Sequence, residues 1–323
     1  MGMFAHTQHL IVRSLSACLL STVLVFAALA ENNENPTIAD MPYGSDSERQ
    51  KLDFWKPESD KPTPVVLMIH GGGWIRGDKS AYNANAVRPY LKHGIAVVRL
   101  NYRLISQAMA QHVDPPVKAC LHDAARALQT VRSKAKEWNI DPNRVGSTGG
   151  SAGACTSLWL ALHDDLADPK SDDPIARQST RLTCAAVDVA QTSLDPKQLR
   201  EWMANAEYAG HAFGFSAEGR SRKDEFELLL ANREKLLPQI KEYSPIEWVS
   251  KDDPPIYMDY VREPEPAPFG AAQRDPTHSP INGVMLAEKL KDAGVEAVVS
   301  YQGNEDKAYG SIAAFLIKKL DAK

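Results

Sequence analysis

One short stretch, residues 144–153, most constrains what this chain can fold into. It contains Gly149-x-Ser151-x-Gly153 between a short apolar run and a helical pattern. This is the spacing of a nucleophile elbow, a tight strand-to-helix turn with a serine at its tip and glycines where no side chain fits. The turn lifts the hydroxyl above the sheet, over the N-terminus of the next helix, where partial positive charge favours a developing anion. The motif predicts a nucleophilic Ser151, provided that the rest of the chain supplies the setting.

The first 30 residues have the pattern of a secretory signal peptide. Arg13 precedes an apolar run from Leu15 to Ala30, which ends in the small-x-small sequence Ala28-Leu29-Ala30. We therefore expect a signal peptide over 1–30, a mature chain over 31–323, and a secreted or periplasmic protein without stable membrane insertion after cleavage. The run is short for a membrane span, which needs about 20 apolar residues. An uncleaved anchor and lipidation at Cys18 are the alternatives.

The composition limits the possible partners. The formal net charge is −4 at pH 7 and no long basic run is present, which argues against nucleic acid as a partner. The mature chain keeps three cysteines, which allow at most one disulfide, and we favour three small buried thiols (Cys120, Cys155 and Cys184). None of them has the spacing of metal ligands, and the sequence implies no metal and no cofactor.

Alternating strand and helix patterns predict the fold. The apolar runs Pro64–Ile69 and Ile95–Leu100 are typical of strands buried on both faces. We predict strands over 37–43, 50–55, 64–69, 95–100, 182–190, 255–261 and 295–301, and helices over 81–92, 117–138, 151–162, 282–293 and 308–320. The fold class is therefore α/β, a mostly parallel doubly wound sheet in one domain. Residues 193–251 break the alternation, and with a helical pattern over 223–237 they predict an inserted helical cap above the carboxyl edge of the sheet.

A second glycine-rich turn, His70-Gly71-Gly72-Gly73-Trp74, follows the strand over 64–69. The carboxyl ends of parallel strands meet at one sheet edge, so this turn and Ser151 are expected to lie close together. Glycines leave backbone N–H groups uncovered, and we predict an oxyanion hole made by the N–H groups of Gly72, Gly73 and Ala152. Each such donor is worth roughly 3–4 kcal/mol of activation barrier. We also expect Trp74, and His211 from the cap, to contact substrate.

With these motifs the sequence resembles the α/β-hydrolase superfamily, in particular secreted bacterial esterases and lipases of the hormone-sensitive-lipase and feruloyl-esterase-like kinds. The resemblance covers nearly the whole mature chain. Besides the two glycine turns it rests on Pro42-Tyr43-Gly44 to Trp55, Asn101-Tyr102-Arg103-Leu104, Asp123 to Ala127, and Tyr243-Ser244-Pro245-Ile246 leading to Asp253-Pro254-Pro255. It implies a carboxylesterase that acts through a serine, a histidine and an acid. The acid would follow the strand over 256–261, and the histidine would follow the strand over 297–301.

The sequence departs from this family pattern at both positions. No histidine occurs between Tyr301 and Gly310, and Asp306 stands about where the family has one. Directly after the preceding strand the chain has glutamates at 263 and 265, and the first aspartate of that loop is Asp275. The acid–histidine pair is therefore non-standard or degenerate.

His278 is our candidate for the missing base. A serine hydroxyl is a poor nucleophile unless a neighbouring base takes its proton. His278 lies in the long loop 264–280 at the same sheet edge, where Glu263, Asp275 or Asp306 could orient it, and Glu263 is our leading choice. The alternative is a helix-start or surface histidine. We expect His70 to brace the glycine turn.

Two functional hypotheses follow. The first is a secreted serine carboxylesterase that hydrolyses small acyl esters, with acetyl or feruloyl groups on polysaccharides suggested by analogy alone. Its partner would be a small-molecule or polysaccharide-linked ester. The second is a catalytically degenerate α/β-hydrolase that binds an acylated or carbohydrate ligand. The missing histidine after the last strand motivates the second hypothesis, and the complete glycine turns favour the first.

Overall fold

The computed structural model describes residues 35–321, so the predicted signal peptide and Cys18 lie outside the described residues. One eight-stranded sheet has the order β1-β2-β4-β3-β5-β6-β7-β8. The first two strands are antiparallel to their neighbours, and the remaining pairs are parallel. The strands are β1 (Ile38–Pro42), β2 (Lys51–Trp55), β3 (Thr63–Ile69), β4 (Ala96–Leu100), β5 (Ile140–Gly150), β6 (Cys184–Asp188), β7 (Ile256–Asp259) and β8 (Ala297–Ser300). The predicted α/β-hydrolase fold class is confirmed.

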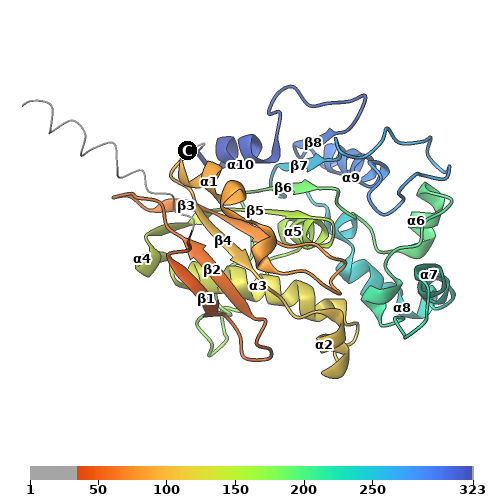
Figure 1. Cartoon of the computed structure of the whole chain (residues 1–323), viewed down its shortest axis with the longest axis horizontal. Helices are drawn as coiled ribbons and strands as arrows, with labels where there is room; N and C mark the ends of the chain where they lie inside the picture. Colours follow the sequence, from red (N-terminus) through yellow and green to blue (C-terminus); the bar gives the residue numbers. More distant parts are fainter. Residues whose placement is uncertain (1–34, 322–323) are drawn as a thin grey trace, which may run out of the picture. The chain divides into compact units, whose positions relative to one another are not determined.

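Helices cover both faces of the sheet (Figure 1). The α-helices are α1 (Ala84–Leu91), α2 (Ile105–Ala110), α3 (Val117–Ser133), α4 (Ala135–Trp138), α5 (Ala152–Leu162), α6 (Pro196–Trp202), α7 (Arg222–Ala231), α8 (Arg233–Tyr243), α9 (Ile281–Asp292) and α10 (Ile312–Asp321). Side chains alternate along β3, so Val66 and Met68 pack with α1 and α10, whereas Leu67 and Ile69 pack with α3 and α5. Both faces of the central strands are therefore buried, as their continuous apolar runs predict.

Two predicted helices are divided in the structure. The helix predicted over 117–138 breaks at Lys134, whose backbone (φ −91°, ψ 5°) leaves the α-helical region between α3 and α4. The helix predicted over 223–237 is α7 followed by α8. Asn232 separates them, and its side-chain amide donates to the carbonyl of Leu228 in the last turn of α7. A side chain that competes for backbone carbonyls favours a helix end over a helix interior.

The segment between β6 and β7 contains α6, α7 and α8 and the short 3-10 helices η2 (Gly210–Phe213) and η3 (Pro245–Trp248). The three α-helices lie together at the right of Figure 1, beyond the carboxyl ends of the central strands. This is the segment that we expect to act as a cap. Over residues 35–321, no helix is long and apolar enough to cross a membrane. The three cysteines of this part of the chain are buried free thiols, as favoured from the sequence.

Candidate active site

Ser151 occupies the tip of a tight turn between β5 and α5. Its backbone has φ 53° and ψ −122°, which costs a non-glycine residue about 1–3 kcal/mol and occurs mainly at functional sites. The Ser151 N–H donates to the carbonyl of Asp188 at the end of β6 over 3.0 Å. A Cβ atom on Gly153 would lie 2.0 Å from the carbonyl oxygen of Ile69, so only glycine fits beside the serine. The geometry is that of the predicted nucleophile elbow.

The second glycine turn packs directly on this elbow. A Cβ atom on Gly71 would lie 2.5 Å from the carbonyl oxygen of Gly150, so the two turns touch, as expected from their shared sheet edge. Gly72 and Gly73 have φ values of 106° and 61°, which favour glycine. Within residues 35–321 their N–H groups have no hydrogen-bond acceptor. They are therefore available to an oxygen atom bound beside Ser151.

His70 braces the glycine turn from below. Its Nδ1 lies 2.8 Å from the carbonyl oxygen of Gly71, and its Nε2 lies 3.3 Å from a guanidinium nitrogen of Arg49. Arginine can only donate, so Nε2 accepts, and Nδ1 carries the proton that it donates to Gly71. Burial lowers the pKa of His70 to about 4. The imidazole is neutral at pH 7, in agreement with the bracing role expected from the sequence.

This buried histidine predicts a pH-dependent stability. The pKa of an unfolded histidine is near 6.5. Between pH 6.5 and about 4, residue 70 is therefore protonated in the unfolded chain and neutral in the folded one. The free energy of unfolding contributed by this group therefore falls as the pH falls through that window, by about 1.4 kcal/mol per pH unit. His70→Asn keeps a donor to Gly71 but removes the titration. In urea unfolding between pH 6 and 5, we expect the wild-type slope to exceed the variant's by that amount; equal slopes would refute the assignment.

The structure brings Ser151, His278 and Asp275 into one chain of hydrogen bonds. Ser151 Oγ lies 3.0 Å from His278 Nε2, and His278 Nδ1 lies 2.8 Å from Asp275 Oδ2. Burial would raise the pKa of Asp275, but hydrogen bonds from His278 and the Thr277 N–H lower it below its usual range. The ionised carboxylate accepts from Nδ1, which leaves the Nε2 lone pair facing the serine hydroxyl. This is the arrangement of a serine nucleophile with its base and orienting acid.

The choice of Glu263 as the acid is wrong in this structure. Nδ1 of His278 has room for one partner, and Asp275 occupies it. Glu263 instead lies in the turn after β7, where its N–H donates to the carbonyl of Tyr260. Asp306, the third candidate, accepts the N–H groups of residues 308–310 and so shapes the turn after β8. The acid and the base therefore both come from the loop between β7 and α9.

Hydrogen bonds to two other parts of the fold, and others within the loop itself, hold this loop in place. The Thr277 carbonyl accepts from the Gln191 side chain, which follows β6, over 2.8 Å. Asn205 of the cap segment exchanges two hydrogen bonds with the backbone of Gln273. The Gln273 side chain closes the loop internally on Ala267 and Ser279. His278 is thus positioned without a residue from the segment after β8, where the family pattern places the histidine.

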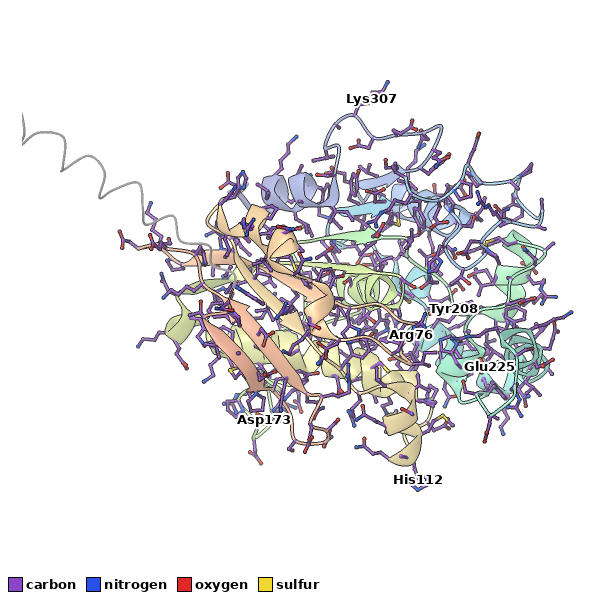
Figure 2. The ribbon with its side chains drawn as sticks, in the orientation of Figure 1. Arg76, His112, Asp173, Tyr208, Glu225 and Lys307 are labelled. Carbon is purple, nitrogen blue, oxygen red and sulfur yellow. The ribbon has the colours of Figure 1, made fainter. Side chains whose placement is uncertain are left out.

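A cavity of about 620 Å³ opens above Ser151. Its walls come from the glycine turn, the loop that carries His278, and the cap segment, and its lining includes Gly72, Gly73, Ile75, Arg76, Ser151, Glu207, Tyr208, Arg222, Pro276, Thr277 and His278. Arg76 and Tyr208, both labelled in Figure 2, line this cavity from the segment after the glycine turn and from the cap segment. A volume in this range suits a small-molecule ligand.

Neither residue that we expected to contact substrate lines this cavity. Trp74 is 0% exposed, and its indole N–H donates to Thr156 on α5. His211 is 1% exposed and packs against the rings of Trp74 and Tyr208. Both side chains support the cavity wall from behind. Arg76 and Arg222 do line the cavity, and neither was predicted, because an arginine in a polar surface segment carries no distinctive sequence signal.

Over the described chain, no group of three or more His, Cys, Asp or Glu side chains could hold a metal ion. The site consists instead of a serine, an imidazole, a carboxylate and uncovered backbone N–H groups. That donor set suits acyl transfer through a covalent serine intermediate.

Comparisons with known proteins agree with this reading of the fold. Carboxylesterase NlhH of Mycobacterium tuberculosis is 32% identical over 117 residues, which are 36% of this chain and 34% of that protein. The chain spans only 21% to 37% of the length of the curated relatives that it matches first. An acetyl ester-xyloside bifunctional hydrolase from Caldicellulosiruptor lactoaceticus has a similar structure. Its TM-score is 0.56 at 26% identity, with 78% of this chain and 76% of that chain covered.

A truncated carbohydrate esterase from gut microbiota shares the fold at 21% identity, with a TM-score of 0.64 over 90% of this chain and 98% of that chain. The sequence profile of the BD-FAE family matches residues 52–260, well over half of the chain. This matched range holds both glycine turns and the elbow serine, while His278 and Asp275 lie beyond it. The chain therefore belongs to the BD-FAE family.

Proposed function

We propose that this protein is a serine carboxylic ester hydrolase in which Ser151 is the nucleophile, His278 the general base and Asp275 the orienting acid. The observation that carries the proposal is the continuous hydrogen-bonded chain from Ser151 Oγ through the imidazole to the Asp275 carboxylate. Esterases among the sequence relatives support the same reaction type. A degenerate, ligand-binding hydrolase would have no need of this complete chain.

The proposed chemistry uses each group once. Ser151 Oγ attacks the ester carbonyl while His278 Nε2 takes its proton. The N–H groups of Gly72, Gly73 and Ala152 stabilise the oxyanion that forms. His278 then gives the proton to the leaving alcohol, and the acyl group stays bonded to Ser151 Oγ. A water molecule next attacks the acyl carbonyl while His278 takes its proton, and His278 returns that proton to Ser151 Oγ as the acid product leaves. Asp275 stabilises the positive imidazole that forms in between.

The substrate class that we propose is a small acyl ester, with an acetyl or feruloyl group on a polysaccharide as the finer form. The cavity is partly open to solvent, which would admit an ester attached to a larger molecule. The name of the Caldicellulosiruptor neighbour, an acetyl ester-xyloside hydrolase, points the same way. Export through the proposed signal peptide over 1–30 would bring the enzyme to such extracellular material.

A covalent label tests the nucleophile. A fluorophosphonate should modify one serine per molecule, and peptide mass spectrometry should place the added mass on the peptide that contains Ser151. Hydrolysis of p-nitrophenyl acetate should fall in parallel with labelling. Ser59→Ala removes an exposed loop serine and is the matched control, which should label at the wild-type rate. Activity that survives complete labelling, or a label on another serine, would contradict the proposal.

A further inference from the structure

The cavity above Ser151 carries one cation that is held by buried partners. Arg222, the first residue of α7, lines the cavity, and its side chain is 43% exposed. Its Nη1 donates to Nδ1 of the buried His211 and lies 3.5 Å from Oε2 of Glu225. The Glu225 side chain is only 8% exposed. Two buried partners therefore fix the direction of the guanidinium.

The protonation of His211 follows from this contact. A guanidinium keeps its protons at all accessible pH values, so His211 Nδ1 can only accept from it. The remaining proton of the imidazole is then on Nε2. Burial, and next the charge of Arg222, lower the pKa of His211 to about 3, so the ring is neutral at pH 7. The Gly73 carbonyl lies near this ring, but Nε2 makes no hydrogen bond of normal geometry within residues 35–321.

The unused donors face the oxyanion turn. A Cβ atom on Gly73 would lie 3.6 Å from His211 Nε2 and 3.7 Å from Arg222 Nη2. Arg222 Nη2 has no hydrogen-bond acceptor among the described residues. A charged donor and a neutral one thus converge beside the glycine whose N–H we assign to the oxyanion. Nη2 belongs to a half-exposed side chain that lines the cavity, so an acceptor bound in the cavity can reach it, whereas the His211 imidazole stays buried behind it.

We propose that Arg222, positioned by His211, binds a carboxylate on the acyl side of the substrate, so that the enzyme prefers esters whose acyl group carries a negative charge. This inference rests on the proposed esterase function. The acyl side is assigned because His278 must lie next to the leaving alcohol that it protonates, whereas Arg222 lies beside the oxyanion glycine. A planar guanidinium with a free edge matches the two oxygens of a carboxylate.

The other charges of the cavity are less suited to this role. Arg76 and Glu207 also line it, but both are exposed, and their side chains have no partner among the described residues. Solvated charges of this kind contribute little and are screened by salt. The negative charge of Glu207 disfavours a bound anion and the positive charge of Arg76 favours one, so their effects on anion binding largely cancel. The preference is therefore expected to depend on Arg222.

Two chromogenic esters test the proposal. The mono-p-nitrophenyl ester of adipic acid carries a free carboxylate, and its methyl ester is the neutral counterpart of nearly the same length. We expect the wild-type enzyme to favour the anionic ester in kcat/KM by about tenfold or more. Arg222→Gln should lower that ratio by about 10- to 100-fold, mainly through KM. Glu207→Gln should raise the ratio only slightly, and in 0.5 M salt the difference in ratio between wild type and Arg222→Gln should largely remain.

Matched controls separate the possible failures. Arg220→Gln removes an arginine two residues away that bonds the Phe215 carbonyl and does not line the cavity, so it should leave the ratio unchanged. His211→Phe keeps the ring and removes the contact, and it should lower the ratio as Arg222→Gln does. A ratio that is unchanged in Arg222→Gln, or lowered equally in Arg220→Gln, would overturn the carboxylate site. If neither ester is hydrolysed in a Ser151-dependent way, the proposed esterase function fails instead.

Discussion

Replacing Ser151 or His278 by alanine should each lower kcat for p-nitrophenyl acetate by roughly a millionfold, and the double variant should be no slower than either single one. The reason is that the two groups act as a unit. Without the imidazole the Ser151 proton has no acceptor 3.0 Å away, and without the hydroxyl the base has nothing to activate. The measurement is kcat at saturating ester for the three variants and the wild type, each corrected for hydrolysis without enzyme.

The residual activity is as informative as the loss. The N–H groups of Gly72, Gly73 and Ala152 remain in all three variants, and such donors retain about a 10³- to 10⁴-fold rate over water. His112→Ala removes an exposed histidine of the loop before α3 and should keep full activity. Multiplicative losses in the double variant would show that Ser151 and His278 act independently. A His278→Ala variant with wild-type kcat would show that another group takes the proton.

The two glycine turns could be predicted from the sequence because their geometry is imposed by local contacts. The positions of Gly71 and Gly153 leave no room for a Cβ atom, since backbone oxygens of Gly150 and Ile69 lie there. Only glycine meets that requirement, so it can be recognised in the sequence from residue type and spacing. The apolar runs that form β3 and β4 are equally direct evidence, because burial on both faces demands continuous hydrophobicity. The parallel sheet then brings the turns together.

The orienting acid could not be chosen reliably, because its position depends on the path of a long loop. Family resemblance led us to a carboxylate directly after β7, at Glu263. The loop instead folds on itself, and Asp275 reaches His278 across a single turn whose Asp-Pro-Thr-His sequence suits a side chain that bonds the backbone two residues on. The local signal was present in the sequence. The sequence alone could not rank Asp275 above Glu263 and Asp306. The structure does, because Asp275 bonds the imidazole and Asp306 is engaged in the turn after β8.

The predictions that Trp74 and His211 contact substrate are wrong for a different reason. Trp74 follows the oxyanion glycines and was expected to face the ligand. Its backbone has φ 56°, an uncommon value for a tryptophan, and this turns the indole away from the cavity toward Thr156 on α5. No feature of the sequence announces such a backbone angle. His211 does not reach the cavity because Arg222, from the start of α7, contacts its ring and lines the cavity instead.

Asp275→Asn should lower kcat for p-nitrophenyl acetate by about 10⁴-fold while KM changes little. Oδ1 of Asp275 accepts the N–H groups of Thr277 and His278 at 2.9 and 3.3 Å. An asparagine must keep its oxygen at that position, which places its NH₂ group opposite His278 Nδ1. Nδ1 then has to accept, so the proton moves to Nε2, and the ring can no longer take the proton of Ser151.

Glu263→Gln is the matched control, because it makes the same change from carboxylate to amide at the acid position expected from the family. Its kcat should stay within about threefold of wild type, since Glu263 has no hydrogen bond to the imidazole in the described chain. Thermal unfolding of both variants should show that the Asp275 loop remains folded. The reverse ranking, with Glu263→Gln slow and Asp275→Asn active, would mean that the loop rearranges on binding substrate and that Glu263 takes over the imidazole.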